Sequence, residues 1–275
     1  MKTIPRLERT DKKGGVVKKW LEPVTTQHPT CRIFRRCTVA AAVRCAVIRR
    51  AHRQFVSRLA WEFEQNPWLR SVFRALRASL SSGGSPRCLP GAPISTGKSM
   101  VERASELIRE AIRLRIIAPR AIRFEKDEWV VEAAAGAVWQ WFVGGGWLEL
   151  YGLLVCVAAH ALLPAEQQPA EPLARLVLAR NKIHFCELDV VCPLPEGRLL
   201  VVEAKSAKAY YAAQGLEHRL GKAGVSRPLH LVALVGWRNE SRPGRAVCVG
   251  PRRFIEHVAQ LMRLQPGAIR EWLLA

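Results

Sequence analysis

Three acidic residues and a lysine lie in two largely apolar segments of this sequence. Glu187 and Asp189 lie in HFCELDVVC (184–192), and Glu203 and Lys205 lie in RLLVVEAKS (198–206). Both segments are rich in β-branched and large apolar residues, which predicts two buried strands. A charged group in a buried strand costs free energy unless it is paired or binds a metal, so these residues indicate a functional site.

The two predicted strands are joined by PLPEG (193–197), whose Pro and Gly favour a turn, so we predict an antiparallel hairpin. Because strand side chains alternate between faces, Glu203 and Lys205 share one face, and so do Glu187 and Asp189. Asp189 can then lie beside Glu203. Two converging carboxylates repel each other, and a divalent cation relieves that repulsion because it prefers oxygen ligands.

Lys205 adds a further chemical function to this pair of carboxylates. Its ammonium group can orient an attacking water or offset the charge that develops on a phosphoryl group, while a metal polarises the phosphate and lowers the pKa of the water. This combination suits the hydrolysis of a phosphodiester. The alternative is a structural ion network of Asp189, Glu203 and Lys205 on a solvated face.

A further acid precedes the hairpin, in GGGWLELYGLLVCVAAHALL (144–163). The pattern predicts a glycine turn followed by an apolar helix, with Glu149 near the start of that helix. Glu149 is either a member of the site or an acid favoured by the helix dipole in the first turn. The apolar stretch of residues 150–163 is too short to span a bilayer and predicts a buried helix.

The charge of the chain predicts a polyanionic partner. The 275 residues carry a net charge of +20, and residues 1–100 hold 20 Lys and Arg against 5 Asp and Glu. Nucleic acid is the leading candidate, ahead of an anionic membrane surface. The eight cysteines form no CxxC pair, and no apolar signal segment follows the first basic residues. We therefore expect a cytoplasmic protein with no zinc site and no membrane partner.

The organisation of the chain changes near residue 100. A stretch dense in Gly, Pro and Ser (81–93) predicts a linker, and residues 55–65 and 71–80 are typical of helices. The pattern then predicts a helix over 99–114 and a hairpin over 121–133 with EKDE at its turn. Near the end of the chain it predicts a strand over 229–237 and an amphipathic helix over 251–264. We therefore divide the chain into a basic N-terminal segment (1–95), a small winged-helix-like connector (96–143) and a domain that carries the site (144–275).

The residues resemble a known group of enzymes. Asp189 followed by EAK (203–205) resembles the PD-(D/E)XK nuclease superfamily. Four blocks, GGWLE (145–149), ELDVV (187–191), LLVVEAKS (199–206) and LEHRLGKAGV (216–225), resemble one branch of it, the CRISPR ancillary nucleases that carry a CARF sensor domain and respond to cyclic oligoadenylate. The resemblance covers residues 99–275. It implies an α/β fold with a restriction-endonuclease-like mixed sheet flanked by helices, and a role in CRISPR-associated or other antiphage defence.

The same resemblance implies roles for individual residues. Glu149, Asp189 and Glu203 would be ligands of Mg²⁺ or Mn²⁺ and part of the catalytic set, Lys205 the catalytic lysine, and Glu187 an accessory residue. The implied substrate is DNA, RNA or both, and the implied assembly is a homodimer. Residues 1–100 have neither the strand pattern nor the length of a CARF domain, so we do not expect cyclic oligoadenylate to switch this chain. The alternatives are an inactive nucleic-acid-binding module and a structural subunit of a defence complex.

Overall fold

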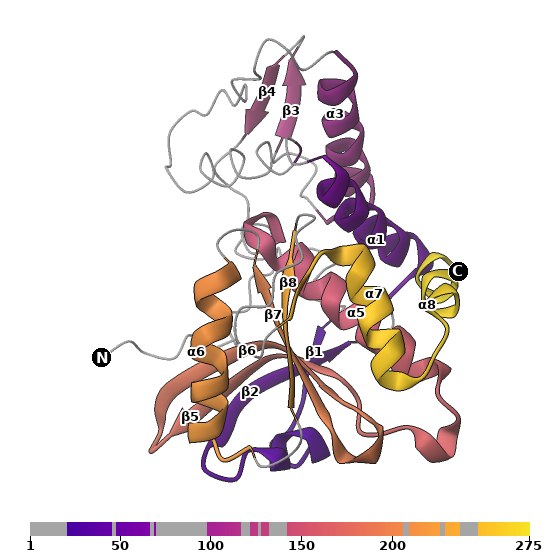
Figure 1. Cartoon of the computed structure of the whole chain (residues 1–275). Helices are drawn as coiled ribbons and strands as arrows, with labels where there is room; N and C mark the ends of the chain where they lie inside the picture. The colour runs from indigo at the N-terminus through magenta and orange to yellow at the C-terminus, as the bar shows by residue number, and fades with distance from the viewer. Residues whose placement is uncertain are drawn as a thin grey trace.

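One mixed β-sheet forms the centre of the molecule. The computed structural model describes residues 21–45, 48–66, 69, 98–116, 122–125, 128–131, 142–205, 209–225, 229–236 and 247–275. Within these residues, seven strands pair in the order β1-β2-β5-β6-β7-β8-β9, antiparallel from β1 to β7 and parallel from β7 to β9 (Figure 1). The strands are β1 (Leu21–Pro23), β2 (Thr38–Cys45), β5 (Leu173–Arg180), β6 (Ile183–Pro193), β7 (Leu199–Lys205), β8 (Leu229–Val235) and β9 (Val247–Val249).

Helices cover both faces of this sheet, which confirms the predicted α/β fold class. Figure 1 shows α6 on one side of the sheet, with α5 and α7 on the other. Two hydrophobic clusters correspond to these two sides, which we call the α5 face and the α6 face. The helices are α1 (Arg50–Gln65), α3 (Lys98–Arg113), α5 (Trp147–Leu162), α6 (Ala209–Lys222), α7 (Pro251–Met262) and α8 (Pro266–Leu274), with a short 3-10 helix, η2 (Pro29–Ile33).

Helix α5 is the central helix of the core, as its apolar sequence predicts. It is buried along most of its length, and a Cβ at Gly152 would lie 3.1 Å from Leu234 Cδ2, so the glycine allows a close approach to the sheet. By length and composition, residues 144–162 are the one stretch in the described chain that could cross a membrane, but 67% of its apolar window is buried inside the fold. Burial by the sheet and neighbouring helices is sufficient to explain this composition.

The described part of the segment 1–95 is not separate from the domain that carries the site. Strand β2 pairs with β5 from Thr38↔Ala179 to Arg44↔Leu173, and α1 packs on α5 and α8. Phe63 of α1 is fully buried, with its ring centroid 4.9 Å from that of Trp147. The predicted boundary therefore does not hold for residues 21–65, because their strands and helix complete the same sheet and the same core.

The region that we predicted to be a connector contains the expected helix and hairpin. Helix α3 contacts α1, and Arg103 Nε donates a hydrogen bond of 2.8 Å to Glu62 Oε2. Strands β3 (Ile122–Glu125) and β4 (Glu128–Val131) pair antiparallel and end at Glu125↔Glu128. The hairpin is therefore confirmed, and its likeness to a winged helix stays a prediction. The predicted linker (81–93) and the predicted helix over 71–80 lie outside the described residues.

Gly145 is needed for the turn that starts α5. It has φ 126° and ψ −9°, a backbone conformation that side chains with a Cβ rarely adopt. We expect Gly145→Ala to lower the free energy of unfolding by about 1–3 kcal/mol, measured by urea denaturation. The matched control is Gly221→Ala in α6, where an added Cβ meets nothing within 4 Å and a gain of about 0.5–1 kcal/mol is expected. Equal stabilisation by both substitutions would contradict this role of Gly145.

Candidate active site

The sheet opens between β6 and β7 at the point where the acidic residues lie. The pairing of these strands runs from Pro193↔Leu199 to Val190↔Val202 and ends there, although the next position would set Asp189 opposite Glu203. Strand β7 continues to pair with β8 as far as Lys205↔Val235. Strand β6 therefore leaves β7 one residue before the pair of carboxylates. The separation provides space for side chains between two strands that are otherwise closely packed.

The alternation of side chains in β6 is interrupted at Asp189. Leu188 packs in the cluster on the α6 face, whereas Val190, two residues later, packs in the cluster on the α5 face. An uninterrupted strand would place both on the same face. Asp189 stands at the transition between the two arrangements.

Strand β5 shows the same interruption beside it. Ala174 packs on the α5 face and Leu176 on the α6 face, and Arg175 between them has φ 49°. Arg175 Nε lies 3.5 Å from Glu187 Oε1 in a half-exposed ion pair. Our expectation that Glu187 shares a face with Asp189 assumed regular alternation, which this irregularity breaks. Glu187 therefore contacts Arg175 on β5, away from the ion pairs that Lys205 forms.

Lys205 joins the two strand carboxylates. Its Nζ lies 2.6 Å from Glu203 Oε1 and 3.6 Å from Asp189 Oδ2. The backbone N–H of Ala204 donates a hydrogen bond of 2.7 Å to Asp189 Oδ2, which fixes this side chain against β7. Glu203 Oε2 is buried and has no hydrogen-bond partner in the described part of the chain. A buried carboxylate oxygen without a partner is costly, so it is suited to a ligand that is not part of the protein.

The charges of the cluster are not balanced by the lysine alone. Burial, together with the charges of Glu203 and Glu149, raises the pKa of Asp189 to about 7, although the charge of Lys205 and the hydrogen bond from the Ala204 N–H act in the opposite direction. Burial by itself would lower the pKa of Lys205, but the nearby charges of Asp189 and Glu203 raise it overall. Glu149 is therefore within electrostatic range of both residues. Three carboxylates around one ammonium leave an excess of negative charge.

The donor set fits a hard divalent cation. Glu149, Asp189 and Glu203 offer carboxylate oxygens, the ligand type that Mg²⁺ and Mn²⁺ prefer, and Glu203 Oε2 has no competing hydrogen bond among the described residues. In the described chain, no three His, Cys, Asp or Glu side chains are already arranged as a metal site, and Lys205 Nζ instead contacts both strand carboxylates. The fit therefore rests on the kind of donor and on the excess negative charge.

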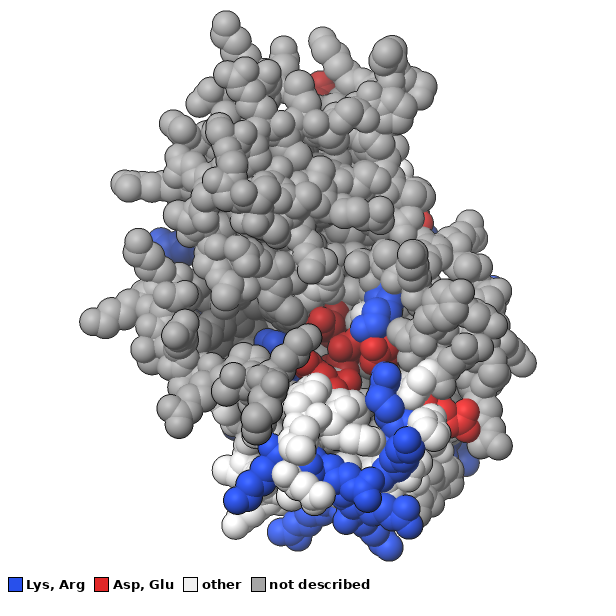
Figure 2. Space-filling model, turned by 90° about the vertical axis from the view of Figure 1, so that its left-hand side faces the viewer, with Lys and Arg blue, Asp and Glu red and all other residues white. Residues whose placement is uncertain are grey.

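Basic side chains border this acidic group. Figure 2 shows acidic side chains gathered near the centre of the face on which α6 and the β5–β6 hairpin lie, with a band of Lys and Arg beside them. Arg219 lies on α6, which packs on β7, and its charge and that of Glu203 both act on the pKa of Cys186, which burial raises to about 11. Arg219 could not be identified from the sequence, because an arginine on a helix gives no local signal of what it lies beside.

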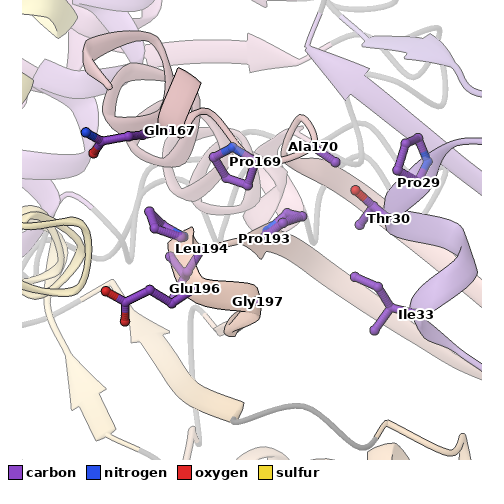
Figure 3. Close-up of a pocket in the computed structure, with 11 residues that line it drawn as sticks. Pro29, Thr30, Ile33, Gln167, Pro169, Ala170, Pro193, Leu194, Glu196 and Gly197 are labelled. Carbon is purple, nitrogen blue, oxygen red and sulfur yellow. The ribbon is translucent and has the colours of Figure 1, made fainter. Parts of the chain in front are cut away.

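A separate pocket of about 370 Å³ lies where η2 approaches the β6–β7 turn (Figure 3). Its lining includes Pro29, Pro169 and Pro193, and the charged residue in it, Glu196, pairs with Arg263 at 2.9 Å. Pro193 is four residues from Asp189 on β6, roughly 13 Å along a strand. The pocket is mostly apolar and holds none of the predicted site residues.

The comparisons with known proteins concern the fold. No protein-family model matches the chain, and no curated protein matches it. The structure is similar to protein VC1899 from Vibrio cholerae, with a TM-score of 0.51, 14% identity, and coverage of 82% of this chain and 58% of that one. Can2 from Sulfobacillus thermosulfidooxidans, solved in complex with cyclic tetra-adenylate, gives a TM-score of 0.47, 15% identity, and coverage of 80% and 57%. The chain spans less than two thirds of either protein, and it shares its fold with VC1899.

Proposed function

We propose that this protein is a metal-dependent nuclease that hydrolyses phosphodiester bonds in nucleic acid. The observation that carries the proposal is the convergence of Asp189, Glu203 and Lys205 where β6 leaves β7, with Glu149 in electrostatic range. A solvated ion network, the alternative considered from the sequence, does not account for Glu203, whose side chain is 8% exposed and has one carboxylate oxygen without a partner among the described residues.

Each residue of the cluster has a role in this proposal. Asp189, Glu203 and Glu149 would hold Mg²⁺ or Mn²⁺ through their oxygens. The metal, when bound, polarises the phosphate and lowers the pKa of a water. Lys205, whose side chain is 34% exposed, is the member of the strand cluster most open to solvent. Its ammonium group donates hydrogen bonds to the attacking water or to the phosphoryl oxygens as negative charge develops on them.

The setting that we propose is antiphage defence, on the basis of the resemblance of four sequence blocks to CRISPR ancillary nucleases. The excess of Lys and Arg over Asp and Glu supports a nucleic-acid substrate. The second candidate is a nucleic-acid-binding module without catalysis. It would explain the positive charge, but it gives no reason for a buried group of carboxylates beside Lys205.

A cleavage assay tests the proposed activity. Purified full-length protein is incubated with supercoiled plasmid and with single-stranded RNA, in Mn²⁺ or in EDTA, with and without cyclic tetra-adenylate. We expect Mn²⁺-dependent cleavage of at least one nucleic acid and none in EDTA, because the carboxylates need a cation to act on a phosphate. We also expect the same rate with and without cyclic tetra-adenylate.

The outcomes of this assay separate the candidates. Cleavage that persists in EDTA would overturn the metal-dependent mechanism. Tight binding of both nucleic acids without cleavage in Mn²⁺ would favour the binding module. Cleavage that depends on cyclic tetra-adenylate would support the nuclease and overturn the expectation that this chain is not switched by that ligand.

A further inference from the structure

Six basic side chains come from three segments that are far apart in the sequence. They lie in the connection from η2 to β2, at the β5–β6 turn and in the last turns of α6. Five are exposed, and Arg219 is partly buried. We call this set the basic strip; it consists of Arg35, Arg36, Arg180, Lys182, Arg219 and Lys222.

Backbone contacts hold the three segments together. The N–H of Arg36 donates a hydrogen bond of 3.0 Å to the carbonyl of Ala223, the residue after α6. Gly224 follows with φ 79°, and a Cβ there would lie 2.7 Å from Arg36 Cγ, so the arginine side chain packs over this glycine. The end of α6 and the start of β2 therefore form one continuous surface.

The β5–β6 turn joins the same surface. Thr38 pairs with Ala179 across β2 and β5, and Thr38 Oγ1 donates a hydrogen bond of 3.2 Å to the Ala179 carbonyl. Arg180 follows at once, and its charge lowers the pKa of Cys37, which burial raises. The turn itself places Lys182 at φ 63°, in the left-handed conformation of a two-residue hairpin loop. The positions of Arg180 and Lys182 are thus set by the sheet.

The strip reaches the candidate active site through α6. Cys186 on β6 is buried, and the charges of Arg219 and Glu203 both act on its pKa. Arg219 Nε is buried and has no hydrogen-bond partner in the part of the chain that the structure describes. Helix α6 packs on β7, the strand of Glu203 and Lys205, and Figure 2 shows a band of basic side chains beside the acidic group on this face.

The strip lacks the counter-charges that basic residues have elsewhere in the molecule. Arg103 pairs with Glu62, Arg252 with Glu64, and Arg270 with Glu256. Among the described residues, no carboxylate forms an ion pair with any member of the strip. Like charges gathered without partners repel one another and destabilise a fold, whereas a polyanion would neutralise them.

We propose that the basic strip binds the phosphate backbone of the nucleic acid that enters the candidate active site. The inference rests on the proposed function for the identity of the ligand. It adds the surface and the path, from Arg219 on α6, across Arg36, to Lys182 at the hairpin tip. Phosphates spaced along one strand match a row of cations held by a rigid sheet and helix, and binding releases the counterions that surround the nucleic acid.

The test measures binding without cleavage. A fluorescein-labelled DNA duplex and a single-stranded RNA of equal length are titrated with the full-length protein in EDTA, from about 50 to 200 mM salt. The variant Arg36→Gln/Arg180→Gln/Lys182→Gln should weaken binding at least about tenfold. It should also lower the slope of log affinity against log salt by about 2–3, close to one unit for each lost phosphate contact.

The matched control is Arg113→Gln/Arg253→Gln/Arg263→Gln, which removes three exposed charges from other surfaces, with side chains that are 72%, 60% and 79% exposed. Both variants have the same net charge, so a difference between them reports position and not total charge. The midpoint temperature of thermal unfolding is measured for each variant, and a value equal to that of the wild-type protein shows that the variant is folded. Equal slopes for the two variants would overturn the proposal, as would failure of the wild-type protein to bind either nucleic acid at low salt.

The binding result is independent of the proposed nuclease activity. If the strip variant loses affinity in EDTA but the wild-type protein never cleaves with Mn²⁺, the proposed binding surface is supported and the proposed nuclease activity is contradicted. If the wild-type protein cleaves with Mn²⁺ and the strip and control variants bind equally, the nuclease activity is supported and the proposed binding surface is contradicted. Binding to phosphatidylserine vesicles in place of nucleic acid would also overturn the proposal.

Discussion

Replacement of Asp189, Glu203 or Lys205 by alanine should each lower the rate of metal-dependent cleavage by at least about two orders of magnitude. The substitutions of Asp189 and Glu203 each remove carboxylate oxygens from the proposed metal site. The substitution of Lys205 removes the cation that stabilises negative charge on the phosphate. Asp189 Oδ2 and Glu203 Oε1 lie 3.6 and 2.6 Å from Lys205 Nζ. Single-turnover cleavage rates in Mn²⁺ measure the effect.

Glu187→Ala is the matched control for these substitutions. Glu187 is two residues from Asp189 on the same strand, but it pairs with Arg175 and not with Lys205. We expect its cleavage rate to stay within about threefold of the wild-type rate, because loss of a half-exposed ion pair changes stability by less than about 1 kcal/mol. Wild-type cleavage by Lys205→Ala, with an unchanged thermal midpoint, would contradict the assignment.

Deletion of residues 1–95 should prevent the protein from folding. The deletion removes β1, β2 and α1, so it exposes the edge of β5 and one side of α5. Truncation of a single buried aromatic side chain in a core typically costs about 3–5 kcal/mol, and most domains are stable by only about 5–15 kcal/mol. Circular dichroism and thermal unfolding of the truncated protein measure the outcome.

A large effect is also expected at a single position of α1. Phe63→Ala should lower the free energy of unfolding by about 3–5 kcal/mol, because Phe63 is fully buried against Trp147. Arg50→Ala, at the exposed start of the same helix, should change it by less than about 0.5 kcal/mol. A truncated protein that is folded and unfolds cooperatively would show that residues 1–95 form a separate segment after all.

The local patterns of the sequence were sufficient for the part of the fold that holds the site. Apolar runs with a Pro–Gly turn between them predicted the hairpin of β6 and β7, and a continuous apolar stretch predicted α5 as a buried helix. The pair Glu203 and Lys205 could be placed on one face because two residues apart on a regular strand always share a face. That spacing allows the contact of 2.6 Å between their side chains.

Features that depend on distant parts of the chain could not be predicted in the same way. Strand β2 is rich in alanine, which has low strand propensity, and it forms because β5 offers an edge to pair with. The interruption at Asp189 arises jointly with Arg175 on the neighbouring strand, so Glu187 was placed on the wrong side. Arg36 lies beside the end of α6 only because its N–H donates a hydrogen bond to the Ala223 carbonyl. None of these leaves a signal within one segment.

Mn²⁺ binding measured by isothermal titration calorimetry tests the central claim most directly, because it does not require the substrate to be known. At about pH 8, Asp189, with its pKa raised to about 7, is ionised and competes least with protons for the metal. We expect saturable Mn²⁺ binding by the wild-type protein, weaker binding as the pH falls below about 7, and no measurable binding by Asp189→Asn/Glu203→Gln. Binding of Mn²⁺ by that double variant with wild-type affinity, or no binding by the folded wild-type protein, would contradict the account.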